Sequence, residues 1–186
     1  MNPYEVVESH RAYDGELSRV RVDRVRMPDG QVVSREVVEH PDAVAVVAVD
    51  AEGNVVLVRQ YRHPLGGHLL EIPAGKCDVD GEDPVSTAHR ELIEEVGLAA
   101  TDLTELIRFR NSGGWADEET TVYLATGLSE AHPPEGFTAE AEEASIEIQK
   151  VPLSEAVGRA QRGELADAKT VIGVLLAAAR LASSPP

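Results

Sequence analysis

Three glutamates recur at helical spacing in the middle of the chain, directly after an arginine. Arg90 is followed by Glu91, Glu94 and Glu95. On a helix the three carboxylates leave the same side, where each like-charged pair costs roughly a few tenths of a kcal/mol. Either water surrounds them, as in most such runs, or a cation neutralises them. Mg²⁺ and Mn²⁺ prefer oxygen ligands of this kind, so the run is a candidate metal site.

The helix that carries these glutamates has well-defined ends in the sequence. Asp83 can cap its first turn, Pro84 suits the first helical position, and Gly97 suits the position after the last turn. Its apolar positions fall on one face, roughly opposite the carboxylates, and are Val85, Ala88, Leu92 and Val96. The sequence therefore predicts an amphipathic helix between residues 83 and 97.

Strand patterns surround this helix and predict an α+β fold. Residues 4–39 alternate apolar and polar positions around a turn at Pro28-Asp29-Gly30, which indicates a small antiparallel sheet. Residues 43–50 and 54–63 are apolar runs around a turn, which predicts a hairpin that begins a core sheet. Further strands are expected at 103–110, 120–125 and 145–151, and further helices at 154–162 and 167–181.

Composition narrows the possible partners. The net charge of −16 disfavours nucleic acid, because such binding relies on clustered Lys and Arg, but a metal can still bring a small anion to an acidic site. The single cysteine, Cys77, excludes an intramolecular disulfide and indicates a reducing, cytoplasmic setting. No run of residues approaches the length needed to cross a bilayer, and residues 1–16 do not read as a leader, so no membrane partner is expected.

The wider spacing around the glutamates resembles the Nudix box. That pattern is Gly, five residues, Glu, seven residues, Arg-Glu, an aliphatic residue, any residue, Glu-Glu, any residue, Gly and an aliphatic residue. Gly75, Glu82 and residues 90–98 match every fixed position, except that six residues separate Gly75 from Glu82. The extra residue affects the loop and leaves the helical positions in register. The resemblance implies a Nudix fold, in which helices sandwich a mixed β-sheet core beside a small N-terminal antiparallel sheet.

The resemblance also implies a role for each residue of the box. Glu91 and Glu95 would be the principal ligands of Mg²⁺, or of Mn²⁺, with Glu94 assisting and the Ala74 carbonyl completing the shell. Arg90 and Glu82 would orient these carboxylates, which agrees with the bidentate pairing that arginine makes.

Segments outside the box resemble the ADP-ribose pyrophosphatases of that family. The matching segments are residues 35–40, 59–63, 71–75 and 122–125. Residues 112–119 resemble a Ser-Pro-Gly segment with an acidic pair, but Gly113 stands where that group has proline. The implied substrate-binding residues are Arg62, Trp115, Arg35 and Glu36. Trp115 could stack on adenine or simply anchor its loop. The basic pair at the strand end, in which Arg62 is favoured over His63, could hold phosphate or ribose.

An acidic segment, residues 133–144, is expected to be a loop. In the resembling enzymes a loop glutamate activates the attacking water, and Glu142 or Glu143 aligns best with it, although most acidic loops only add solubility. Two or three Mg²⁺ ions would then support hydrolysis of ADP-ribose to AMP and ribose 5-phosphate.

Alternatives to ADP-ribose hydrolysis remain open. The substrate could be another nucleoside diphosphate sugar or a dinucleotide such as NADH, and the chain could also be a catalytically silent ADP-ribose sensor or a purely structural acidic domain. The expected organisation is a dimerisation arm at residues 1–40, a catalytic domain at 41–182 and a frayed tail at 183–186. The resembling enzymes exchange the arm between two subunits, so a homodimer is expected.

Overall fold

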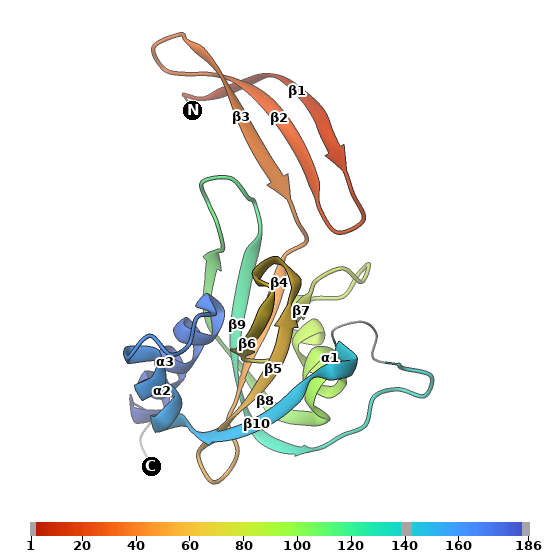
Figure 1. Ribbon diagram of the computed structural model, residues 1–186, viewed down its shortest axis with the longest axis vertical. Coiled ribbons are helices and arrows are strands. Elements are labelled where there is room, and N and C mark those ends of the chain that lie inside the picture. The colour runs from red at the N-terminus through yellow and green to blue at the C-terminus, as the bar shows by residue number, and fades with distance from the viewer. Residues whose placement is uncertain (1–2, 139–142, 184–186) are drawn as a thin grey trace. The chain divides into compact units, whose positions relative to one another are not determined.

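The computed structural model describes residues 3–138 and 143–183, which fall into two compact units (Figure 1). Unit 1 takes in the chain up to Asp42 together with Phe109–Thr120, and unit 2 takes in the remainder. The predicted division into an arm of residues 1–40 and a domain of residues 41–182 stays a prediction, because Phe109–Thr120 also belongs to unit 1.

Unit 1 is built on a three-stranded antiparallel sheet in the order β1-β2-β3. Its strands are β1 (Glu5–Asp14), β2 (Arg19–Arg26) and β3 (Val32–Glu39). The turn between β2 and β3 closes when the Gly30 amide donates to the Met27 carbonyl over 2.9 Å. Gly30 has a φ of +87°, a conformation that glycine adopts without strain. The antiparallel sheet and this turn are as the sequence predicted.

The segment between two long strands of the chain attaches to this sheet. The Val38 amide of β3 donates to the Trp115 carbonyl over 2.8 Å, and the Asp117 amide donates to the Val38 carbonyl over 3.2 Å. Val38 and Ala116 thus form a parallel bridge. The backbone of residues 115–117 is therefore fixed along the edge of β3.

Unit 2 contains two sheets, and two of its strands continue into unit 1. The four-stranded sheet has the order β7-β4-β9-β8, and its strands are β4 (Ala43–Ala48), β7 (Ala74–Lys76), β8 (Leu98–Arg110) and β9 (Glu119–Glu130). The three-stranded sheet has the order β10-β5-β6, and its strands are β5 (Asn54–Arg62), β6 (Gly67–Glu71) and β10 (Glu147–Pro152).

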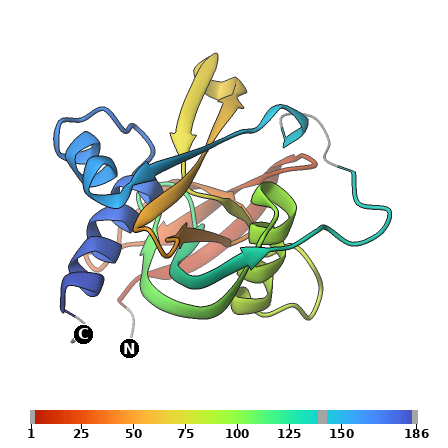
Figure 2. The same cartoon turned by 90° about the horizontal axis from the view of Figure 1, so that it is seen from below.

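Three α-helices of the described residues cover these sheets. They are α1 (Pro84–Val96), α2 (Leu153–Gln161) and α3 (Ala168–Ser183), and the short 3-10 helices are η1 (His63–Leu65) and η2 (Glu143–Ser145). Within unit 2, α1 lies on one side of the sheets, and α2 and α3 lie together on the other (Figures 1 and 2). The expected α+β architecture, with helices around a mixed sheet, is confirmed. Among the described residues, no helix is long and apolar enough to cross a membrane.

The turn predicted between β4 and β5 is present, but the prediction that the two strands pair in one sheet is wrong. The Asp50 carboxylate accepts from the Asn54 amide over 2.8 Å, and a single bridge joins Val49 to Val55. Beyond that bridge the two strands diverge into different sheets. Both strands bury both faces, so each needs cover on two sides, and the separation provides it.

Strand β4 divides the core into two halves because its successive side chains point to opposite faces. Val44, Val46 and Ala48 belong to the apolar cluster under α1, and its helical members are Ala88, Leu92 and Val96. On the other face Val47 approaches Gly173 of α3 so closely that a Cβ there would lie 2.8 Å from the Val47 Cγ2. Both helices can therefore pack closely against one strand.

One residue of the predicted apolar face of α1 is misplaced. Val85 is 41% exposed, whereas Leu92 on the same helix is fully buried. Val85 lies in the first turn, beside the loop that enters the helix, and the core cluster does not include it.

We predict that Leu92→Ala lowers the free energy of unfolding by about 2–5 kcal/mol, because it leaves a cavity under α1. Val85→Ala is the matched control on the same helix and should change that free energy by about 0.5 kcal/mol or less. Urea denaturation measures both values. Equal losses in the two variants would contradict this division of the helix into core and surface.

Candidate active site

Helix α1 begins and ends as its sequence predicted. The Asp83 Oδ1 accepts from the backbone amides of Val85 and Ser86 at 2.9 Å, and Pro84 occupies the first helical position. Gly97 has a φ of +65° and its amide donates back to the Ile93 carbonyl. These two caps fix where the helix begins and ends.

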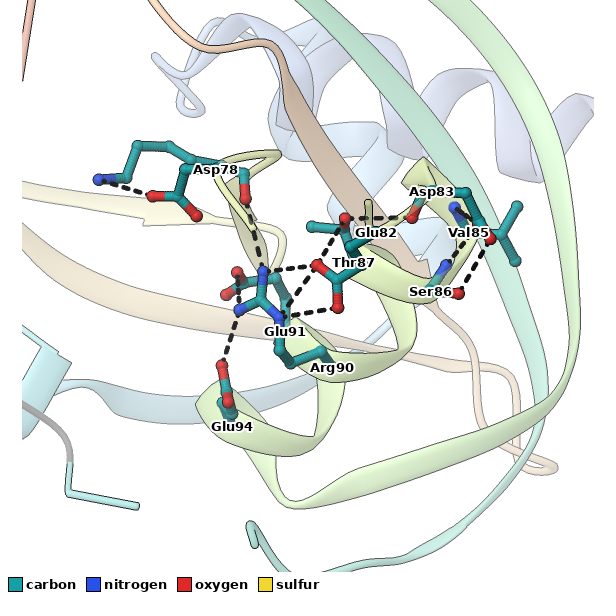
Figure 3. A network of polar contacts seen from close by, with 10 residues as sticks. Asp78, Glu82, Asp83, Val85, Ser86, Thr87, Arg90, Glu91 and Glu94 are labelled. Carbon is teal, nitrogen blue, oxygen red and sulfur yellow. Dashed lines mark hydrogen bonds and ion pairs between the residues drawn. The ribbon is translucent and has the colours of Figure 1, made fainter. Parts of the chain in front are cut away.

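Arg90 gathers three carboxylates around its guanidinium (Figure 3). Its Nη2 lies 3.0 Å from a Glu82 oxygen, and its Nη1 lies 2.6 Å from Glu91 and 3.0 Å from Glu94. The guanidinium also reaches the Lys76 carbonyl at 3.5 Å. Desolvation lowers the pKa of Arg90, but its bonds and charge contacts with these carboxylates outweigh that effect and hold the pKa above its ordinary value. Arg90 therefore contacts three of the carboxylates that the resemblance expects it to orient, and that role stays a prediction.

Glu82 is fixed from two sides in the loop before the helix. It accepts from Arg90 and, at 2.9 Å, from the Thr87 hydroxyl. The hydrogen bond from Arg90, with a smaller one from Thr87, holds the pKa of the Glu82 carboxyl below its usual value against the desolvation that raises it. Glu82 is therefore a charged anchor for Arg90.

Glu91 lies where the sequence did not predict. It is 9% exposed, and a Cβ added to Gly75 would lie only 1.9 Å from its Cδ atom. The carboxylates were expected roughly opposite the apolar face, and for Glu91 that expectation is wrong. At about 100° per residue, Glu91 stands roughly 60° from Ala88 around the helix axis, so the two side chains are neighbours. The missing side chain of Gly75 gives the Glu91 carboxylate its place against β7.

Glu95 reaches the same strand by a backbone contact. The Ala74 amide donates to the Glu95 Oε2 over 2.9 Å. The sequence had pointed to the Ala74 carbonyl as a ligand, and the structure adds that the amide of this residue orients Glu95. Both carboxylates thus lie against β7. Glu91 occupies the space beside Gly75, and Glu95 accepts a hydrogen bond from the Ala74 amide.

The chemistry of this cluster fits a hard divalent cation. Within the described residues it brings together the carboxylates of Glu82, Glu91 and Glu94 around the single guanidinium of Arg90, and Glu95 of the same helix accepts from the Ala74 amide of β7. Carboxylate oxygens are the donors that Mg²⁺ and Mn²⁺ prefer. In the parts of the chain that the structure describes, no three acidic, His or Cys side chains converge on a common metal position. The donor set fits by type and by its excess of negative charge.

A second charged cluster lies around Glu71, at the end of β6. The Glu71 residue is only 1% exposed. Its two carboxylate oxygens accept from the Nε and Nη2 of Arg62, each at 2.7 Å, and Lys169 also contacts it. Burial raises the pKa of Glu71, but the bonds and charges of Arg62 and Lys169 outweigh it, and the pKa lies below its usual value. Arg62, a predicted phosphate contact, is therefore held in one orientation with 38% of its side chain exposed.

The sequence pointed to Glu71 only as part of a segment and gave no role to Lys169. Lys169 follows Glu71 by 98 residues, and nothing in either local pattern links them. The available signal was the charge of residues 167–170 at the start of a predicted apolar helix.

The remaining predicted residues lie outside this cluster. Trp115, which is 59% exposed, and the exposed Arg35 and Glu36 of β3 belong to unit 1, where the bridge between Val38 and Ala116 attaches the Trp115 segment to β3. The metal-site candidates belong to unit 2. Of the two candidate bases, Glu142 lies outside the described residues and Glu143 begins η2.

Comparison with family models decides what this arrangement is. Residues 39–172 match the NUDIX domain, and residues 4–38 match the nucleoside diphosphate sugar hydrolase N-terminal domain. The chain belongs to the Nudix family. It is a Nudix hydrolase, and its chemistry is that of a pyrophosphatase.

Several relatives of this Nudix hydrolase cover nearly all of its chain. An ADP-ribose pyrophosphatase from Mycobacterium tuberculosis (strain ATCC 25618 / H37Rv) is 46% identical over 92% of this chain and 82% of its own length. An ADP-ribose pyrophosphatase from Bacillus subtilis (strain 168) is 38% identical over 91% and 90%. A methanol dehydrogenase activator from Bacillus methanolicus is 39% identical over the same shares. The crystal structure of an ADP compounds hydrolase, at 22% identity, matches with a TM-score of 0.82 over 96% of this chain and 94% of that one, which supports the fold.

We predict that Gly75→Ala lowers kcat/KM for pyrophosphate-bond hydrolysis by roughly 10–100-fold, because the new Cβ must displace the Glu91 carboxylate. Gly67→Ala is the control, since a Cβ there has only the Leu65 carbonyl nearby, at 3.9 Å. Steady-state kinetics at a fixed metal concentration compares the two variants. Unchanged activity in Gly75→Ala would show that the position of Glu91 does not matter.

A pH prediction follows from the lowered pKa of Glu82. A depressed folded-state pKa contributes stability above the unfolded value, 4.5, and that contribution is lost as the pH falls through the folded value. The difference in unfolding free energy between wild type and Glu82→Gln should therefore be constant near neutral pH and shrink below about pH 4.5. Urea denaturation over this range measures it. A difference that grows as the pH falls would contradict the Arg90 contact.

Proposed function

We propose that this Nudix hydrolase cleaves the pyrophosphate bond of ADP-ribose, with Mg²⁺ or Mn²⁺, to give AMP and ribose 5-phosphate. The observation that carries the proposal is the carboxylate cluster that Arg90, Gly75 and Ala74 hold between α1 and β7. The choice of ADP-ribose is supported by two relatives with that activity in their names, at 46% and 38% identity.

The carboxylates of Glu91, Glu95 and Glu94, with the Ala74 carbonyl, would hold the cation. When bound, it lowers the pKa of a water molecule and balances charge on the diphosphate. Arg90 and Glu82 keep the carboxylates in place, since both already contact the cluster. The clustered carboxylates would repel an anionic pyrophosphate. A bound cation would neutralise their charge and so allow the substrate to bind.

Arg62 would contact the diphosphate, because its bidentate pair with Glu71 fixes the plane of its guanidinium before substrate arrives. Glu142 or Glu143 would accept the proton of the attacking water. Water attacks one phosphorus, the bridging P–O bond breaks, and the leaving phosphate departs as AMP or ribose 5-phosphate. Trp115, Arg35 and Glu36 would bind the adenosine portion, with Trp115 stacking on the base.

A second substrate class is favoured by one observation in the sequence. Gly113 replaces the proline of the ADP-ribose pyrophosphatase segment. A GDP-mannose pyrophosphatase from Cronobacter sakazakii (strain ATCC BAA-894) is also 33% identical over 84% of this chain. Hydrolysis of another nucleoside diphosphate sugar is therefore the alternative.

The decisive test combines a substrate panel with a ligand variant. With Mg²⁺, ADP-ribose should give the highest kcat/KM among ADP-ribose, GDP-mannose and NADH. Glu95→Gln should lose at least ~100-fold, more than the usual effect of a residue behind the ligands. Glu155→Gln on α2, whose partner is Arg159, is the exposed control and should keep full activity. Undiminished turnover of Glu95→Gln at saturating Mg²⁺ would contradict the assignment of Glu95 as a metal ligand.

We also propose that the chain forms a homodimer through the N-terminal sheet. All ten residues of β1 are exposed, and they include the large apolar side chains of Val6 and Tyr13. Large exposed apolar patches mark protein–protein interaction sites, and Tyr4, Val7 and Leu17, in or beside this strand, are exposed as well. Light scattering should give about twice the chain mass of 20.0 kDa. A monomer mass at micromolar concentration would contradict this.

A further inference from the structure

The connection between β6 and β7 crosses from one sheet of unit 2 to the other, and three consecutive residues are each held by a different element. The Ile72 amide donates to the Thr170 hydroxyl over 2.8 Å, and the Pro73 carbonyl accepts from the Val46 amide over 2.8 Å. The Ala74 amide donates to Glu95 over 2.9 Å. The backbone that presents Ala74 and Gly75 to the carboxylates is therefore fixed from outside the Nudix box as well as from within it.

The contact with Thr170 is fully buried on both sides. Ile72 and Thr170 both have zero exposure, and they are 98 residues apart in the chain. The same hydroxyl donates to Asp167, whose second contact is with the Thr170 amide at 2.9 Å. The Thr170 hydroxyl thus links Asp167, at the start of α3, to the Ile72 amide in the segment before β7. A buried amide that lost this acceptor would be left unsatisfied.

Lys169 attaches the preceding residue of that segment to the same helix. Its ammonium contacts the buried Glu71 carboxylate and lies 2.9 Å from Asp167. Arg62 completes the group, so two cations face two carboxylates and their charges cancel. Paired in this way, the charges can be buried without the cost of an isolated ion. Glu71 and Ile72 are therefore both anchored to the first turn of α3.

We propose that Lys169 and Thr170 are positioning residues for the metal site: they hold the Glu71–Gly75 segment, whose Ala74 amide holds Glu95. This rests on the proposed metal-dependent function. Each acts on the carboxylate cluster through the backbone that ends at Ala74. Loss of the Thr170 hydroxyl releases the Ile72 amide, loosens Ala74 and weakens the hold on Glu95, so the free protein binds a divalent cation less tightly.

The test measures binding of Mn²⁺ alone, without substrate, by electron paramagnetic resonance of the free ion. Thr170→Val removes the hydroxyl and keeps the side-chain size, and it should weaken Mn²⁺ binding about tenfold, the usual scale for residues behind metal ligands. Thr170→Ser restores a hydroxyl and should bind within about twofold of wild type. Val174→Ala, a buried change one turn further along α3, is the stability control and should lower Tm without changing Mn²⁺ binding.

A second readout needs no metal. Amide hydrogen exchange of the metal-free protein should be faster at Ala74 in Thr170→Val than in Val174→Ala, because only the first variant frees the segment. If Thr170→Val does not fold, Lys169→Met and its conservative partner Lys169→Arg take its place, with weaker Mn²⁺ binding expected only in the methionine variant.

The possible results separate the two proposals. Wild type that binds no Mn²⁺ overturns the proposed metal dependence and the positioning role with it. Wild type that binds Mn²⁺, with equal affinity in Thr170→Val and Val174→Ala, overturns the positioning role alone. Weaker binding in Thr170→Val, rescued by Thr170→Ser, supports it.

Discussion

Repulsion among carboxylates is the constraint on which the rest of the structure depends. Glu82, Glu91 and Glu94 lie within hydrogen-bond reach of one guanidinium, and Arg90 keeps them together (Figure 3). Such a cluster destabilises the folded state unless each carboxylate is held in place and paired with a cation or a hydrogen-bond donor. The fold meets this requirement with a helix of fixed ends, a glycine that makes room for Glu91 and a backbone amide for Glu95.

The two halves of the core explain how that helix is placed. Helix α1 packs on one face of strand β4 and α3 packs on the other, so one buried strand positions both helices. The β6–β7 connection is bonded to α3 through Ile72, to β4 through Pro73 and to α1 through Ala74. The site is therefore determined by contacts between elements that are far apart in the sequence.

Much of this could be predicted from sequence because the signals are local. The ends of α1, the turn at Gly30 and the spacing of Gly75, Glu82 and Glu91 need only neighbouring residues. Three features could not be found in this way. The burial of Glu91 depends on β7 packing against α1, the separation of β4 from β5 depends on which strands pair with each, and the contact of Lys169 with Glu71 spans 98 residues.

The carboxylates at β7 are proposed to hold a divalent cation for pyrophosphate hydrolysis, and the position of that cation can be observed. Crystals of the protein grown with Mn²⁺ and a non-hydrolysable ADP-ribose analogue, measured by anomalous diffraction, test it most directly. We expect anomalous density within about 2.0–2.6 Å of oxygens of Glu91, Glu95 and the Ala74 carbonyl, at the distances usual for such cations. Saturating Mn²⁺ that leaves this position without density, or that binds elsewhere beside the analogue, would contradict it.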